Sequence, residues 1–143
     1  MAGSFSNFLE NKLLDQLLGG VAYTFPATIY IGLATAISGD GTTFTEVSTS
    51  GTGYARITVT ANQTNFPAAV GGSTSNGVAF SFPTATTAWG TIVAFGVFDS
   101  GTVGSGNLLL WGDIVVSGVP TPKAIGAGDT ASFGINGLTV TLD

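Results

Sequence analysis

The sequence predicts an all-β fold: a β-sandwich or jelly-roll-like single domain with one N-terminal α-helix. Three observations predict it. The stretch from Trp89 to Asp99 is apolar at nearly every position, about seven or eight short strand-like segments are separated by turn residues, and helical periodicity occurs only near the N-terminus. A chain of 143 residues is long enough for one core, and no linker divides it.

The stretch from Trp89 to Asp99 is the predicted central strand. Its two alternating sets of side chains are both apolar, Ile92, Ala94, Gly96 and Phe98 on one face and Val93, Phe95 and Val97 on the other. A strand with two apolar faces is covered on both sides. A buried helix is the alternative, but the glycines and β-branched residues disfavour it. The predicted core residues are Trp89, Ile92, Phe95, Val97, Phe98 and Trp111.

Residues 6–18 form the one predicted helix. Phe5, Leu9, Leu13 and Leu17 recur every four residues, and Leu14 and Leu18 widen the apolar surface. Ser4, Ser6 and Asn7 are candidate N-caps, and Gly19-Gly20 ends the helix. The helix either covers one end of the β domain's core or docks on a neighbouring subunit. For docking, the predicted interface residues are Phe5, Phe8, Leu9, Leu13 and Leu17.

The remaining strands are short. They are expected at residues 28–35, 54–60, 78–82, 108–116, 131–135 and 138–142, with a bulge or kink at Gly112-Asp113. Asn136-Gly137, between the last two strands, predicts a two-residue hairpin. Residues 37–53 and 62–76 are expected to be loops. The predicted organisation is an N-terminal helical segment, residues 1–20, followed by a β-sandwich domain, residues 21–143.

Composition excludes several classes of function. Only 8% of the residues are charged, against about 25% in an ordinary domain. The net charge is −5, and three cations cannot neutralise many phosphates, so neither nucleic acid nor an anionic membrane is an expected partner. No apolar run is long enough for a spanning helix. A surface built from small polar and apolar residues indicates a component of an assembly.

No catalytic constellation emerges from the residues. Histidine and cysteine are absent, so Ser and Thr lack the usual base, and no thiolate metal site exists. The segment from Ser38 to Glu46 holds only two carboxylates for calcium. Arg56 is either a solvent-facing strand residue paired with an acid or half of an inter-subunit ion pair. The loop carboxylates show no catalytic spacing and are expected to cap turns: Asp40, Glu46, Asp99, Asp113 and Asp129.

The chain resembles a group of small structural proteins of tailed bacteriophages, often labelled tail-fibre-like proteins. Short blocks that run almost end to end carry the resemblance. They are Asn11 to Asp15 (NKLLD), Pro26 to Ala36 (PATIYIGLATA), Gly53 to Arg56 (GYAR), Thr64 to Ala69 (TNFPAA), Ser75 to Gly77 (SNG), Phe82 to Thr86 (FPTAT), Trp89 to Asp99 (WGTIVAFGVFD), Gly106 to Leu109 (GNLL) and Leu138 to Leu142 (LTVTL). The resemblance implies a virion component without enzymatic activity or cofactor.

Within that group, a short single domain without fibrous repeats favours a capsid cement or decoration protein. The alternative is a tail-fibre or tail-associated subunit, and a third is a carbohydrate-binding module that stacks sugars on Trp89, Trp111 or Tyr54. The expected partners are further copies of the chain, most simply in a trimer, and the major capsid protein or tail proteins of the same phage. The expected location is the virion, assembled in the cytoplasm of the infected bacterium.

Overall fold

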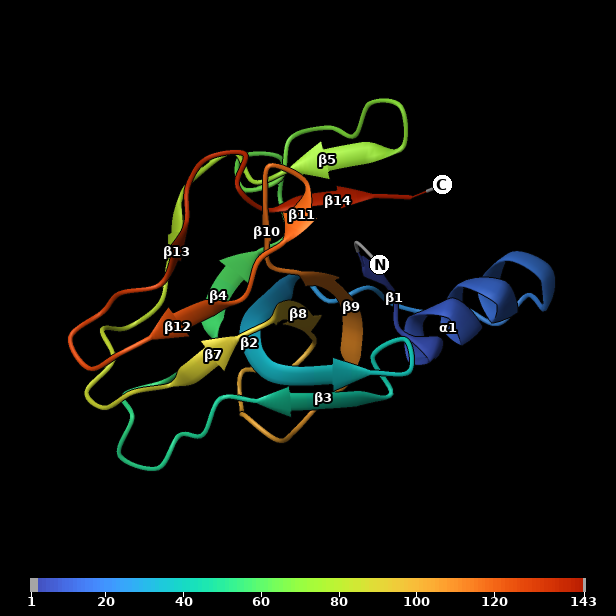
Figure 1. The fold of residues 1–143 in the computed structure, drawn as a ribbon. Coiled ribbons are helices and arrows are strands. Elements are labelled where there is room, and N and C mark those ends of the chain that lie inside the picture. Colours follow the sequence, from blue (N-terminus) through green and yellow to red (C-terminus); the bar gives the residue numbers. More distant parts are fainter. Residues whose placement is uncertain (1–2, 143) are drawn as a thin grey trace.

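A six-stranded antiparallel sheet organises the structure, a computed structural model in which residues 3–142 are described (Figure 1). The strands follow the order β1 (Gly3–Phe5), β9 (Leu108–Asp113), β8 (Ala94–Phe98), β2 (Thr28–Ser38) and β3 (Thr43–Glu46), and β4 (Ile57–Thr60) also pairs with β2. The predicted all-β class with a single helix is confirmed. Met1, Ala2 and Asp143, at the outer ends of the two predicted segments, lie outside the described residues.

Strand β2 is the longest element of the sheet and changes partner along one edge. Its first half pairs with β4, from Thr28↔Thr60 to Ile31↔Ile57, and its second half pairs with β3, from Ala34↔Glu46 to Ser38↔Thr43. Its other edge pairs with β8 throughout residues 30–34. Strand β3 falls in the segment that the sequence predicted to be a loop, because its four residues, Thr-Phe-Thr-Glu, are too few to show a periodicity above the surrounding Gly and Thr.

The predicted central strand lies where expected but is divided in two. Strand β8 is buried at every position and lies between β2 and β9. The preceding β7 (Gly90–Ile92) leaves this sheet to pair with β12 (Lys123–Ile125), and Val93 makes the transition between the two partners. Phe95 packs against Phe133, whereas Phe98 packs against Phe44, so the two rings lie on opposite faces of the sheet.

Three two-stranded ribbons and a hairpin complete the fold. Strand β5 (Ser73–Ser75) pairs with β14 (Thr139–Thr141), β6 (Phe80–Ser81) with β13 (Ser132–Phe133), β7 with β12, and β10 (Val115–Val116) with β11 (Val119–Pro120). The predicted hairpin at Asn136-Gly137 is therefore wrong, since β13 and β14 pair with different strands. The fully buried Asn76 explains this: its amide donates to the carbonyls of Val78 and Gly134, and its carbonyl accepts from the Leu138 N–H.

One apolar cluster fills the space between the sheet and the ribbons. It includes Ile31, Leu33, Phe95 and Val97 from the sheet and Phe80 and Phe82 from the chain around β6. The six residues predicted for the core are all buried, with Trp89, Ile92, Phe95 and Val97 in this cluster and Phe98 and Trp111 on the far face of the sheet.

Helix α1 (Asn7–Leu18) lies at the edge of the β body and projects away from it (Figure 1). The Ser6 side chain caps it by accepting from the Leu9 N–H at 3.3 Å. At the other end, the N–H groups of Gly19 and Val21 both donate to the Asp15 carbonyl. The first half of α1 packs on β9 and β1, and Leu9 is its one buried residue. The second half extends beyond the strands.

Candidate interaction surfaces

The carboxylates expected to cap turns include two clear examples. Asp129 accepts from the Gly126 N–H at 2.7 Å, and Asp99 accepts from the Asn107 backbone N–H at 2.6 Å and from its side-chain amide at 2.8 Å. Asp40 lies in a turn with a φ of 51°. Within residues 3–142, no three His, Cys, Asp or Glu side chains gather as metal ligands. Asp99 and Asp129 therefore stabilise the loops in which they lie.

Glu46 and Arg56 instead form a buried ion pair. The Arg56 Nε donates to Glu46 Oε1 at 2.9 Å and its Nη2 to Oε2 at 2.7 Å, a bidentate arrangement in which the side chains are 2% and 9% exposed. The Arg56 Nη1 donates to the carbonyls of Ser100 and Ser105 at 2.6 and 3.1 Å. Arg56 therefore joins β3 to the loop after β8 within one chain. It is not solvent-facing, and the residue precedes β4 rather than lying in it.

Tyr54 links this ion pair to the sheet. Its hydroxyl accepts from the Leu33 N–H and donates to Glu46 Oε1, both at 2.8 Å. Leu33 stands where β2 changes partner from β4 to β3, so the hydroxyl replaces a missing ladder bond. Burial, reinforced by the charge of Glu46, raises the pKa of Tyr54 well above that of a free phenol. The network is thus a structural joint in the sheet.

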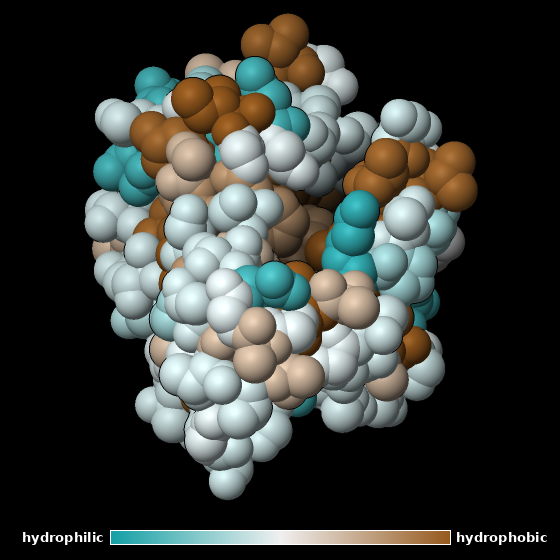
Figure 2. Space-filling view, turned by 60° about the vertical axis from the view of Figure 1, so that its left-hand side comes forward, coloured by the Kyte–Doolittle hydropathy of each residue, from teal (hydrophilic) through white to brown (hydrophobic). Residues whose placement is uncertain are grey.

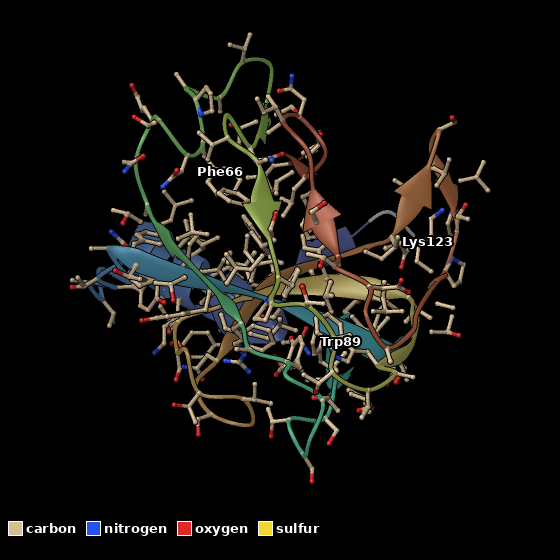
Figure 3. The ribbon with its side chains drawn as sticks, turned by 90° about the vertical axis from the view of Figure 1, so that its left-hand side faces the viewer. Phe66, Trp89 and Lys123 are labelled. Atoms are coloured by element: carbon tan, nitrogen blue, oxygen red, sulfur yellow. The ribbon has the colours of Figure 1, made fainter. Side chains whose placement is uncertain are left out.

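The rings proposed for sugar stacking are not accessible. Trp89, Trp111 and Tyr54 are 5%, 7% and 5% exposed. Trp89 lies inside the fold (Figure 3), where its Nε1 donates to the Thr52 carbonyl at 2.9 Å. Stacking on a sugar needs an open ring face. Because all three rings are buried, the structure argues against the predicted carbohydrate-binding role of these residues.

A groove of about 610 Å³ opens on another side of the molecule. In Figure 2 it is the hollow in the middle of the face, with hydrophobic residues on both sides. The groove is lined by residues of β1 and β9, by Phe133, by the β10–β11 hairpin and by residues of the segment Asn136 to Leu142. Figure 3 shows β6 and β13 side by side, with Phe66 on one side of the pair and Lys123, which lines the groove, on the other.

Two edge strands, β1 and β14, contribute residues to the lining of this groove. In the part of the chain that the structure describes, β1 pairs only with β9 and β14 only with β5, so each keeps one unpaired edge. Asp113 and Lys123 are the titratable side chains that line the groove. Unpaired strand edges are in general sites where a further extended segment can add to a sheet.

A second surface lies on the free half of α1. Leu14, Leu17 and Leu18 are 55%, 80% and 79% exposed, and beyond the helix Val21 and Phe25 are 58% and 54% exposed. We call these five residues the α1 stripe. Three- and four-residue spacing places the leucines on one side of the helix. Asp15 is the one charged residue in this half of α1.

A profile of the family described as "Podophage GP4 fiber I protein gp80" matches residues 4–141, nearly the whole chain. The chain belongs to this family. A search of curated proteins finds no match. The GP4 fiber I family is a family of phage fibre proteins, so the protein is a structural component of a bacteriophage particle. The match favours the tail-fibre alternative over the capsid cement protein that the sequence favoured, and it carries no catalytic assignment.

The interface residues predicted from the sequence are distributed unevenly in this GP4 fiber I family member. Leu9 is buried in the chain's own core, which leaves its side chain no surface for a neighbour, and Phe5, Phe8 and Leu13 are half-buried against that core. Leu17 alone is largely exposed. Leu14, Leu18, Val21 and Phe25, which the sequence does not assign to an interface, are more than half exposed. No helix in residues 3–142 is both long and apolar enough to span a membrane.

Proposed function

We propose that the protein is a non-enzymatic tail-fibre or tail-associated subunit of a bacteriophage virion. The observation that carries the proposal is the family match over residues 4–141, to a protein described as a fibre protein. The fold supports it, because Asp99 and Asp129 cap turns and the buried ion pair of Glu46 with Arg56 joins parts of the same chain. A protein of this kind contributes shape and contacts to the particle rather than chemistry.

Self-association is part of the proposed role, most simply as a trimer. The chain has 8% charged residues and a mean hydropathy of +0.48, and large apolar side chains remain exposed on α1 and around the groove. Such surfaces are unusual on solitary soluble proteins and are normally covered by a partner. Closed symmetric association covers them without unlimited growth. The other partners in this proposal are tail proteins of the same phage.

Localisation on purified particles tests the proposal. Antibodies to the purified protein, used in immunogold electron microscopy, are expected to label the tail, and gel densitometry is expected to give a few to a few tens of copies per particle. The major capsid protein of the same particles is the internal standard. Labelling over the capsid, with hundreds of copies, would contradict the tail assignment and restore the capsid decoration protein.

A further inference from the structure

The α1 stripe stands out against the rest of the helix. Leu9 and Leu13, one and two turns into α1, lie against the chain's own core, but Leu17 and Leu18 in the last turn are about four-fifths exposed. Nothing in the described chain covers them, because the helix has left the strands at this point (Figure 1). A solvent-facing helix end normally carries polar residues. Here it carries leucines.

The local structure fixes the stripe in place. The backbone N–H groups of Gly19 and Val21 donate to the Asp15 carbonyl and hold the C-terminal end of α1 in a defined turn. The ring of Phe25 packs edge-on against Tyr23 at 5.0 Å, and Tyr23 packs in the same way against Phe8 of the helix at 6.1 Å. The segment that follows the helix, with Tyr23 and Phe25, is therefore anchored to the same helix that carries the leucines. An ordered apolar surface loses little conformational entropy when it binds.

We propose that the α1 stripe is the contact by which copies of this chain associate, each stripe packing against the same stripe of two other copies around a common axis. The inference deepens the proposed function, since it names the surface and the partner of a self-associating subunit. Leu14, Leu17 and Leu18 follow the three- and four-residue spacing of a coiled-coil seam, and Val21 lies just beyond the end of the helix. Closed rotational symmetry places the same residues of every copy around the common axis.

The area of the stripe is large enough for a contact between copies of the chain. The exposed surface of the five residues is on the order of 600 Å² per chain, at the upper end for an exposed patch on a monomer. Fully buried, the stripe would remove about 600 Å² per chain from solvent, which reaches the lower limit of about 600 Å² per partner for specific interfaces. A stripe with no charge of its own also favours identical stripes over a charged protein surface.

Lysine substitution tests the proposal in solution. The double variant Leu17→Lys/Leu18→Lys keeps good helix formers and places cations at the helix C-terminus, where they are favourable. The matched control Asn11→Lys/Gln16→Lys adds the same charge at exposed positions of the same helix outside the stripe. Light scattering is expected to give three times the 14.3 kDa chain mass for wild type and control, and a threefold lower mass for the variant, with unchanged circular dichroism.

A cysteine reporter covers the case in which the lysine variant does not fold. The chain has no cysteine, so Leu18→Cys introduces a single thiol, which is expected to form an inter-chain disulfide under mild oxidation. Thr24→Cys, exposed and outside the stripe, is expected to remain uncrosslinked. A wild-type monomer at every concentration, an unchanged mass for the lysine variant, or equal crosslinking at both cysteines would overturn the proposal. Capsid labelling in virions would instead overturn the tail-fibre function and leave this contact standing.

Discussion

One face of the sheet formed by β2, β8 and β9 meets a wide layer of apolar side chains, and the opposite face is covered by much less material. On the first face, Leu33 and Phe95 pack into the cluster that reaches Phe82 and Phe133. On the second face, Gly32 and Gly96 lie beneath the rings of Phe98 and Phe44. The Arg56 guanidinium covers Phe98, its carbon 3.6 Å from the ring centroid.

The difference teaches how a chain with few charges closes the second side of a buried sheet. The first face is stabilised by apolar volume, which any well-packed side chains supply. The second is thin, so glycines allow close approach, and one of the chain's three cations is held there by a bidentate carboxylate. We therefore expect the first face to be sensitive to lost volume, and the second to added volume and to broken polar bonds.

The largest expected effect is on the apolar face. Phe95→Ala removes a ring that is 7% exposed and packs against Phe133 at 5.7 Å, so the free energy of unfolding should fall by about 3–5 kcal/mol. Urea unfolding at one fixed protein concentration measures it. Val70→Ala, at a position 81% exposed, serves as control and should change stability by less than about 0.5 kcal/mol. Wild-type stability in the Phe95 variant would remove the contrast between the faces.

The next effect is on the ion pair. Arg56→Met leaves the Glu46 carboxylate buried without its cation and should cost about 3 kcal/mol, since the Tyr54 hydroxyl still donates to it. The double variant Arg56→Met/Glu46→Gln removes the unpaired charge and should recover more than half of that loss. A double variant no more stable than the single one would show that Arg56 acts through packing on Phe98 alone.

A smaller loss is expected from added volume on the thin face. A Cβ at Gly32 would lie 2.6 Å from Glu46 Oε1 and 3.1 Å from Phe98 Cε2, and both atoms belong to side chains held by Arg56. Gly32→Ala should therefore destabilise by about 1–3 kcal/mol. Gly134→Ala is the matched control, because a Cβ there meets nothing within 4 Å. Equal stability of the two variants would mean that the second face is loosely packed.

The parts of the fold that could be predicted from the sequence are those set by residues close together in the chain. Two apolar faces in one strand predicted β8, and four-residue periodicity predicted α1, because both patterns are local and extend over several residues. Strands such as β6 and β13 have two residues each and no pattern of their own. The Asn136-Gly137 hairpin signal was overridden by Asn76, which is 60 residues away and holds the Gly134 and Leu138 backbones.

The candidate surfaces divide in the same way. The leucines of α1 were recognised, but periodicity alone could not say which of them the sheet would cover, so Leu9 was assigned to the interface and Leu18 was not. Glu46 and Arg56 are ten residues apart in a segment with no regular pattern, and their other partners, Ser100 and Ser105, come from a distant loop. Only the three-dimensional arrangement shows that Arg56 does pair with an acid, Glu46 of the same chain, but in a buried position rather than a solvent-facing one.

The smallest effect concerns the joint between the faces, where the Tyr54 ring lies in the apolar cluster and its hydroxyl reaches the ion pair. Tyr54→Phe leaves the Leu33 N–H without its acceptor and should cost about 1–2 kcal/mol at pH 7. Because burial raises the pKa of Tyr54, the folded state keeps its proton above pH 10 while the unfolded state loses it. The wild-type free energy of unfolding should therefore fall above pH 10, by up to about 1.4 kcal/mol per pH unit from this residue.

The Tyr54→Phe variant should lose that part of the pH dependence and keep the part due to Tyr23, whose pKa burial also raises. The two proteins should therefore differ by a constant amount between pH 7 and 9 and converge as the pH rises beyond 10, which urea unfolding at stepwise pH measures. The curves converge because, as the pH rises, ionisation of Tyr54 stabilises the unfolded state of the wild type but not its folded state. The variant has no such group, so its free energy of unfolding lacks this decrease. Parallel curves up to pH 11 would show that the Tyr54 hydroxyl ionises as easily in the fold as in water, and that the joint is open to solvent.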